Sequence, residues 1–322
     1  MNNQPLLNIE HLRLSFFTPA GEVKALNDVS FQLEQGDVLG IVGESGSGKS
    51  VTAYSIMGLT AYPGRIVGGE IHFNDHEIHK MTEKEMRSIR GKEVSIIFQD
   101  PMTSLNPVYT IGNQICEVIR LHTNKTKEQA HARAVELLSL VGINEPERRL
   151  KQYPHELSGG MRQRVMIAIA LACEPKLLIA DEPTTALDVT IQAQILELMM
   201  ELKKKIGMSI IMITHDLGVV SNMCDKIAVM YAGKIVEYGT ADDIFYNPQH
   251  EYTRGLLTSI PKLNATEHER LVPIEGQPVD LLNPPAGCPF APRCKSCMKI
   301  CLREMPPYTH FSEDHYSACW LT

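Results

Sequence analysis

Residues 43 to 50 read Gly-Glu-Ser-Gly-Ser-Gly-Lys-Ser and match the phosphate-loop pattern G-x-x-x-x-G-K-[ST] at every fixed position. An apolar run at 38–42 comes before them and predicts a buried strand, and residues 51–57 after them predict a helix. In a strand, glycine loop and helix of this kind, backbone N–H groups converge on a bound phosphate. The sequence therefore predicts a site for a nucleoside triphosphate.

Each residue type in this loop has its own task. The glycines permit a close backbone approach to the phosphates, Lys49 reaches the terminal phosphates, and the Ser50 hydroxyl ligates Mg²⁺. The residues that we assign to nucleotide binding here are Gly43, Glu44, Ser45, Gly46, Ser47, Gly48, Lys49, Ser50 and Val51. Kinases, GTPases, helicases and transporters all use such a loop, so the rest of the chain must separate them.

A second apolar strand, at 177–182, ends in two carboxylates. Asp181 is placed to hold the magnesium shell, as the strand-end acid does in other phosphate-loop enzymes. Glu182 is placed to polarise the attacking water, because in-line attack requires an acceptor aimed at that water. The pair predicts hydrolysis of the bound nucleotide.

The segment Leu-Ser-Gly-Gly-Met-Arg-Gln-Arg at 157–164 resembles the LSGGQ signature of ABC-type ATPases, with Met161 in place of glutamine. Further marks of that family follow its order: Phe16 for the aromatic that stacks on adenine, Gln99 for the Q-loop, Ala186-Leu187-Asp188 for the D-loop and His215 for the switch histidine. The resemblance covers residues 5–260 and implies ATP as the nucleotide. It implies catalytic roles for Glu182, His215 and Gln99, and a Mg²⁺ site of Ser50, Gln99 and Asp181.

Ser158, Gly159 and Gly160 precede a helix predicted over 162–172, so a hydroxyl and free N–H groups lie at its positive end. This is a second anion site in a chain with one phosphate loop, and it is best explained as serving a partner's nucleotide. The resemblance implies a head-to-tail dimer with two ATP molecules sandwiched at the interface. Met161 lacks the amide of glutamine but leaves the Ser-Gly-Gly site intact.

The expected fold is α/β, with a RecA-like P-loop core, an antiparallel β-subdomain and an inserted helical subdomain. Short antiparallel strands are predicted over 6–42, and a parallel sheet with helices over 37–100 and 165–240. Helical periodicity without strands fills 104–156, within a helical subdomain at about 104–165 that, by resemblance, docks on membrane subunits. Asp188 is predicted to cap a helix whose apolar stripe is Ile191, Ile195, Leu198, Met199 and Leu202.

Composition narrows the setting. The chain has 322 residues, 21% of them charged, and a net charge of −7, which gives no reason to expect a general nucleic-acid binder. No apolar run reaches the length of a membrane span, and the N-terminus lacks a signal-peptide pattern. We therefore expect a protein at the cytoplasmic face of the membrane, attached through partners.

The C-terminal part is rich in proline and cysteine, and we place a domain boundary between 1–262 and 263–322. Prolines at 273, 278, 284, 285, 289 and 292 predict an extended connection. Five of the eight cysteines lie in the last 35 residues, and in a cytosolic protein such a cluster indicates metal ligands, for zinc or an iron–sulfur cluster. The other three, Cys116, Cys173 and Cys224, are expected to pack as small apolar side chains.

Residues 287–294, Gly-Cys-Pro-Phe-Ala-Pro-Arg-Cys, resemble the Gly-Cys-x-Phe-x-x-Arg-Cys pattern in the C-terminal region of oligopeptide, dipeptide and nickel ABC importers. Some members hold a [4Fe–4S] cluster there. The resemblance implies Cys288, Cys294, Cys301 and Cys319 as its ligands, with Zn²⁺ as the alternative metal. Cys297 is extra to the pattern.

These resemblances predict an ATP-hydrolysing subunit of an ABC importer for dipeptides or oligopeptides. Its partners would be a second homologous ATPase subunit, in a heterodimer, two permease subunits and an extracytoplasmic binding protein. An importer of nickel or another small solute is the first alternative. A soluble ABC ATPase acting on ribosomes or DNA is less favoured, since the chain has neither two fused cassettes nor a long coiled coil. A small-molecule kinase would leave the signature and the cysteines unexplained.

Overall fold

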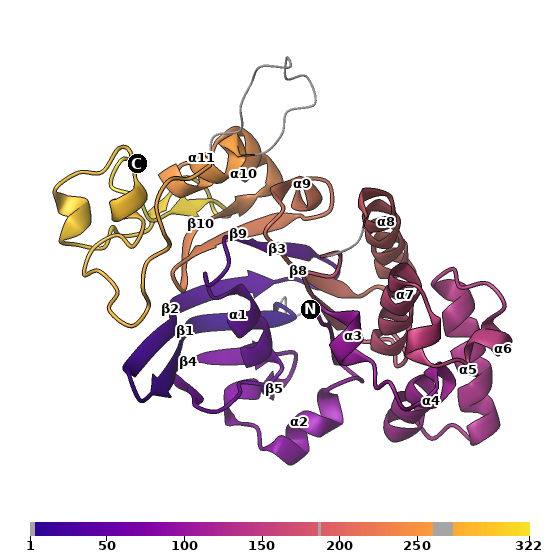
Figure 1. Ribbon diagram of the computed structural model, residues 1–322. Helices are drawn as coiled ribbons and strands as arrows, with labels where there is room; N and C mark the ends of the chain where they lie inside the picture. The colour runs from indigo at the N-terminus through magenta and orange to yellow at the C-terminus, as the bar shows by residue number, and fades with distance from the viewer. Residues whose placement is uncertain (1–3, 186–187, 260–272) are drawn as a thin grey trace. The chain divides into compact units, whose positions relative to one another are not determined.

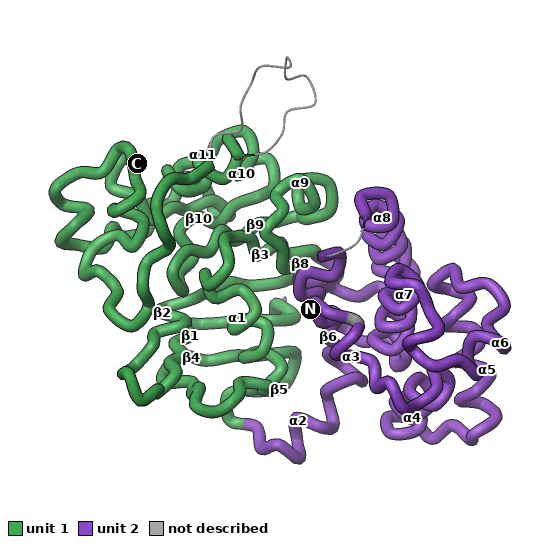
Figure 2. Tube along the Cα trace, in the orientation of Figure 1, with its two compact units in different colours: residues 1–34, 38–80, 212–322 green, residues 35–37, 81–211 purple. Residues whose placement is uncertain are grey.

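The computed structural model describes residues 4–185, 188–259 and 273–322 (Figure 1). The chain forms two compact units, which Figure 2 distinguishes by colour. Unit 1 comprises residues 1–34, 38–80 and 212–322, and unit 2 comprises 35–37 and 81–211. The boundary predicted at 262/263 lies outside the described residues, as do Ala186 and Leu187 of the D-loop-like segment.

Unit 1 begins with a four-stranded antiparallel sheet in the order β2-β1-β4-β5. Its strands are β1 (Leu7–Thr18), β2 (Gly21–Leu33), β4 (Gly64–Phe73) and β5 (His76–Glu77). The antiparallel sheet predicted over 6–42 is confirmed for β1 and β2, which are longer than the short strands expected, but residues 38–42 belong to the other sheet and pair in parallel. The parallel pattern assigned across 37–100 is wrong for β4 and β5. Periodicity identifies a strand but not the edge where it pairs, and β4 runs antiparallel along β1.

A second sheet carries the phosphate loop, and within unit 1 its strands follow the order β11-β12-β10-β9-β3. The strand β3 (Val38–Val42) pairs in parallel with β9 (Lys226–Tyr231), as predicted. The parallel prediction is wrong for β10 (Lys234–Thr240), which forms an antiparallel hairpin with β9. Every residue of β3 is buried, which explains its continuous apolar run.

The helices of unit 1 flank these strands (Figure 1). They are α1 (Lys49–Ile56), the 3₁₀ turn Ile78–Lys80, α9 (Leu217–Val220), α10 (Ala241–Tyr246) and α11 (Glu251–Thr258). The strand β8 (Ser209–Thr214) contains the boundary between the units.

The C-terminal segment of unit 1 contains no α-helix within the described residues 273–322, as its prolines predict. It has two 3₁₀ turns, Ala291–Arg293 and Ile300–Leu302, and two short strands, β11 (Thr309–His310) and β12 (Tyr316–Ser317). The strand β12 adds to the edge of β10, where the Tyr316 and Tyr238 rings stack with centroids 5.2 Å apart. No local pattern in the sequence predicts this strand.

Unit 2 contains the predicted helical insertion. Its elements are α2 (Glu83–Ile89), β6 (Val94–Ile97), α3 (Pro101–Ser104), α4 (Ile111–His122), α5 (Lys127–Leu140), α6 (Pro146–Arg149), the 3₁₀ turn Pro154–Glu156, α7 (Gly159–Ala170), β7 (Leu177–Asp181) and α8 (Val189–Ile206). Strands β6 and β7 pair in parallel, as predicted. None of the helices in the described ranges combines the length and the apolar character that crossing a bilayer requires.

Helix α8 follows its sequence pattern closely. The Asp188 carboxylate accepts a hydrogen bond from Ile191 N at 2.9 Å and caps the helix. Along the predicted stripe, Ile195, Leu198, Met199 and Leu202 are buried, and Ile191 is half-buried. Gly207 ends the helix with φ 77°, the left-handed conformation that glycine adopts without a side-chain penalty.

Candidate functional site

The residues predicted to bind nucleotide fall in both units, and each group is described by itself. Unit 1 holds Phe16, the loop 43–51 and His215, and unit 2 holds Gln99, Asp181, Glu182 and residues 158–160.

The phosphate loop has a backbone that requires its glycines. Gly43, Gly46 and Gly48 have φ of 151°, 78° and 104°, in the region that L side chains rarely adopt. A Cβ on Gly43 would lie 2.2 Å from the carbonyl oxygen of Met230, a backbone atom of β9. The glycine therefore lets the loop pass directly over the neighbouring strand.

Lys49 lies at the first turn of α1 and is 5% exposed. Its Nζ donates to the carbonyl oxygens of Gly43, at 2.8 Å, and Glu44, at 3.0 Å. The Lys49 ammonium therefore lies inside the loop that the sequence motif predicts to bind phosphate. Ser50 is half-buried on the next position of the helix.

Phe16 and His215 are also in unit 1. Phe16 is half-buried on β1, opposite Gly64 of β4, and a Cβ on Gly64 would approach its ring edge to 2.8 Å. His215 is exposed directly after β8, and Asp216 beside it caps α9 through Gly218 N at 2.8 Å. A strand-end histidine is therefore present where the sequence predicts it.

In unit 2, Asp181 is the buried last residue of β7, 2% exposed, and Glu182 follows it. Glu182 has φ 47°, which is uncommon for a residue other than glycine. Its Oε2 accepts from Gln99 Nε2 at 2.8 Å and from Thr185 Oγ1 at 3.0 Å. Two predicted catalytic residues, far apart in sequence, thus meet here, and Thr185 is a partner that the sequence did not reveal.

The signature segment caps its own helix in this structure. Ser158 Oγ accepts from Met161 N at 3.3 Å, and helix α7 begins at Gly159. Ser158 is exposed, and a Cβ on Gly159 would meet open space, so one side of this helix end is accessible. The arrangement has the hydroxyl and the positive helix end that the sequence predicts.

The structure gathers the predicted cysteine ligands. We call residues 287–322 the cysteine lobe. Cys288, Cys294, Cys301 and Cys319 line one cavity, whose lining does not include the exposed Cys297. Burial raises the pKa of the Cys288 thiol to about 11, and the nearby Cys301 and Cys319 add to the effect.

Gly287 explains part of the cysteine motif. A Cβ at this position would lie 2.1 Å from the carbonyl oxygen of Cys301, and Cys288 N donates to that same oxygen at 2.8 Å. The glycine thus lets two cysteine-bearing segments approach through their backbones. Of the other three cysteines, Cys224 is buried, as predicted, and Cys116 and Cys173 are half-buried.

His250 lines the same cavity and is 1% exposed. Its Nδ1 accepts from Tyr252 N at 3.0 Å, so a neutral ring carries its proton on Nε2. That Nε2 has no hydrogen-bond partner among the described residues. The ring is neutral at ordinary pH because burial lowers its pKa to about 4. A buried N–H donor therefore lacks an acceptor beside the four thiols.

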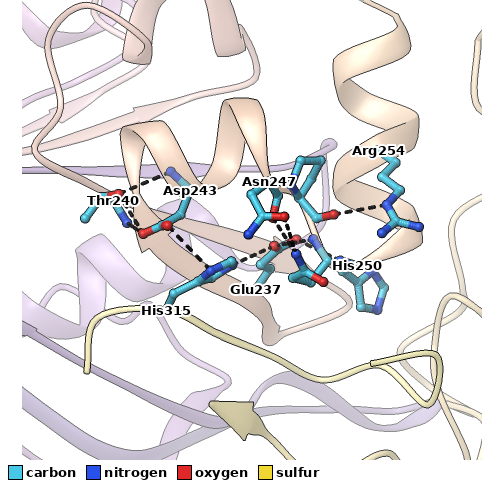
Figure 3. Close-up of polar contacts among 9 residues, drawn as sticks. Glu237, Thr240, Asp243, Asn247, His250, Arg254 and His315 are labelled. Carbon is cyan, nitrogen blue, oxygen red and sulfur yellow. Dashed lines mark hydrogen bonds and ion pairs between the residues drawn. The ribbon is translucent and has the colours of Figure 1, made fainter. Parts of the chain in front are cut away.

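A polar network, shown in Figure 3, holds the C-terminal segment onto the rest of unit 1. The fully buried Glu237 on β10 accepts from Gln249 N at 2.6 Å and His250 N at 2.9 Å, at the start of α11. His315 Nε2 of the cysteine lobe bonds the same carboxylate at 3.1 Å. Neither His250 nor His315 belongs to a sequence motif, so no local pattern predicted this network.

Comparisons with known proteins agree with these motifs. The family model described as ABC transporter matches residues 26–185, and the model described as the C-terminal region of oligopeptide/dipeptide transporters matches residues 236–301. The oligopeptide transport ATP-binding protein of Bacillus subtilis is 58% identical, over 98% of this chain and 88% of its own length. The Lactococcus lactis dipeptide transport ATP-binding protein is 53% identical, over 100% of this chain and 92% of its own length.

Solved structures support the fold. A dimeric, post-hydrolysis structure of the ATP-binding cassette MJ0796, bound to ADP and Pi, matches with a TM-score of 0.66 and 26% identity. The match covers 73% of this chain and 98% of that one. The expected α/β phosphate-loop fold is therefore confirmed.

Proposed function

This chain belongs to the ATP-binding proteins of oligopeptide and dipeptide ABC transporters, and from that membership we propose how its residues act. The chain is the ATP-hydrolysing subunit of an ABC importer, and its hydrolysis powers the uptake of dipeptides or oligopeptides. The main structural support for ATP binding is the phosphate loop, whose glycines have positive φ and which holds the Lys49 ammonium inside it.

Mg²⁺·ATP binds at residues 43–51, with Phe16 stacking on the adenine and Ser50, Gln99 and Asp181 serving the metal. The bound Mg²⁺ neutralises developing charge on the phosphates. Glu182 polarises the attacking water, and the contacts from Gln99 and Thr185 support that role because they fix its carboxylate. His215 contacts the γ-phosphate and reports its presence.

Two substitutions test these roles. Glu182→Gln keeps the shape but removes the general base, so ATP should still bind while turnover in the assembled transporter falls by at least roughly a hundredfold. Lys49→Ala should weaken ATP binding itself. The exposed Glu201 on α8 supplies a matched control, because Glu201→Gln should turn over at the wild-type rate. Near-normal turnover of Glu182→Gln would exclude the proposed base.

Ser158, Gly159 and Gly160 act on the ATP of a partner ATPase subunit in a head-to-tail pair. The accessible helix end at Gly159 supports this proposal. A Ser158→Arg chain mixed with a wild-type partner should impair the site whose phosphate loop belongs to the partner. If an isolated monomer hydrolyses ATP as fast as the assembly at all concentrations, the shared-site proposal fails.

The partner ATPase is a second, different subunit, and the other partners are two permeases and an extracytoplasmic binding protein. Binding to the permeases holds this chain at the cytoplasmic face of the membrane. No residue of this chain is assigned to the peptide. A reconstituted transporter should hydrolyse ATP faster when its binding protein carries a peptide. Equal stimulation by a nickel-loaded binding protein would favour the alternative substrate.

Cys288, Cys294, Cys301 and Cys319 hold one [4Fe–4S] cluster, which ties the proline-rich segment into a compact lobe. Their four side chains line one cavity, and the buried Nε2–H of His250 beside them lacks the acceptor that a thiolate or sulfide would supply. A tetrahedral zinc site, with Zn–S bonds of about 2.3 Å, would hold its sulfurs about 3.8 Å apart. Among the described residues, no three of these cysteine sulfurs lie within 4.8 Å of one another. The four sulfurs are therefore spaced more widely than a zinc site requires.

Metal analysis decides this proposal. Anaerobically purified protein should be brown, with roughly four iron atoms per chain. Colourless protein with stoichiometric zinc would support the alternative metal, and protein with neither would reject both. Cys297→Ser should leave the metal content unchanged, since Cys297 is exposed outside the cavity.

A further inference from the structure

An arginine of the cysteine lobe reaches the phosphate loop. Both ends of the Arg293 guanidinium pair with the Glu44 carboxylate, Nη1 with Oε2 at 2.5 Å and Nη2 with Oε1 at 3.0 Å. The two residues are 249 positions apart, and the Arg293 side chain is 4% exposed. A bidentate, charge-assisted pair of this kind is both strong and geometrically specific.

The guanidinium is fixed from other directions as well. Its Nε donates to the carbonyl oxygen of Glu275 at 3.0 Å and its Nη2 to that of Ile274 at 3.2 Å. The Tyr231 ring lies beneath it at 5.9 Å, and the side chain passes Gly276, whose absent Cβ would meet Arg293 Cγ at 3.2 Å. These contacts hold the Arg293 guanidinium in one orientation. Because the side chain is buried, water does not compete for its hydrogen bonds to Glu44.

Glu44 is in turn bonded to the parts of the loop that meet phosphate. Its carbonyl oxygen accepts from Lys49 Nζ at 3.0 Å and from Ser47 N at 3.2 Å. Its N–H donates to the buried Tyr252 hydroxyl at 2.8 Å. A movement of Glu44 thus moves the carbonyl that orients the lysine.

The charge of Glu44 makes its partner necessary. A carboxylate within a loop that receives a triphosphate repels that ligand, and a guanidinium in direct contact offsets the repulsion. Arg293 fills this role from a segment that is not part of the core motifs. Its backbone N–H donates to Phe290 O at 2.9 Å, and Cys294 follows it, so its position is set by the fold of the cysteine lobe.

We propose that Arg293 is a positioning residue for ATP, which neutralises Glu44 and fixes the phosphate loop from the cysteine lobe. This inference rests on the proposed ATP site at residues 43–51. It makes the C-terminal extension part of the nucleotide-binding apparatus, since loss of the lobe's fold would release the loop.

Titration of the full chain with trinitrophenyl-ATP tests the proposal. Arg293→Ala should raise the Kd by roughly tenfold, which corresponds to about 1.4 kcal/mol. In the assembled transporter, the KM for ATP should rise while kcat changes little. Adding Glu44→Gln to Arg293→Ala should lower the Kd again by at least about threefold, because the unpaired carboxylate charge is removed. Effects of two substitutions at contacting residues are coupled in this way.

Controls separate this inference from the assignments on which it depends. Arg254→Ala removes a half-exposed ion pair with Glu251 on α11 and should bind as wild type does. If Arg293→Ala does not fold, Arg293→Lys with and without Glu44→Gln measures the same coupling, because lysine keeps the charge but loses the fork.

Two results would overturn the inference. One is a Kd of Arg293→Ala within twofold of wild type, and the other is independent, multiplicative effects of the two substitutions. If Lys49→Ala also binds normally, the ATP site itself is wrong. If Lys49→Ala loses binding while the Arg293 variants do not, only the role of Arg293 fails.

Discussion

The strongest prediction for stability concerns Glu237, because one buried carboxylate joins three chain segments (Figure 3). Glu237→Gln preserves the shape, but its amide has one oxygen where the carboxylate has two. Oε1 accepts from Gln249 N and His315 Nε2, and Oε2 accepts from His250 N. The best orientation of the amide keeps the first pair and places an NH₂ group against the His250 N–H.

The magnitude follows from that count. Loss of one charge-assisted hydrogen bond costs about 1.5–3 kcal/mol, and the buried donor left unpaired adds about 1–3 kcal/mol. We expect a total decrease of about 3 kcal/mol in the free energy of unfolding, since the two contributions overlap. Urea unfolding followed by circular dichroism measures it, through a lower midpoint at an unchanged slope.

The control uses the same chemical change at an exposed position of the same segment. Glu313→Gln lies two residues before His315, and we expect less than about 0.5 kcal/mol from it. A Glu237→Gln protein that unfolds within about 0.5 kcal/mol of wild type would refute the reasoning, because the carboxylate would then contribute no more than an amide.

Three further predictions concern single residues. Gly43→Ala should abolish trinitrophenyl-ATP binding, because its Cβ would lie 2.2 Å from Met230 O; retained binding would contradict the loop geometry. Tyr252→Phe should lower the unfolding free energy by about 1–3 kcal/mol, since the Glu44 N–H loses its acceptor; an unchanged urea midpoint would argue against that bond. Burial holds the pKa of His250 near 4, below the value of about 6.5 in the unfolded chain. Its neutral form therefore contributes stability above pH 6.5 that is lost toward pH 4, about 2 kcal/mol by pH 5, and His250→Gln should lack this part of the pH dependence.

Local sequence patterns determined the elements that carry the nucleotide motifs. The left-handed glycines at 43, 46 and 48, the Ser158 and Asp188 caps and the stripe of α8 all depend on residues within one turn or loop. Such signals act over a few positions, so the chain order reveals them directly. The motif at 287–294 likewise revealed Cys288 and Cys294, whereas Cys301 and Cys319 were assigned through the resemblance to the importer family.

Pairing over long distances was decided by the tertiary structure alone. Three such pairings join residues that no short sequence pattern relates. They are the pairing of β12 with β10, the pairing of β4 with β1, and the hydrogen bond between Glu237 and His315. Their geometry depends on where whole elements pack, and side-chain type does not specify it.

Arg293 depends both on a local sequence motif and on the tertiary fold. The sequence identified it only as a member of the cysteine motif, next to Cys294. The fold then brought it to Glu44, across 249 positions, into a pocket that buries its charge. The sequence thus determined which residue types the cysteine lobe and the phosphate loop contain. Tertiary packing determined that they touch, because a buried ion pair forms only where the backbone brings both groups together and excludes water.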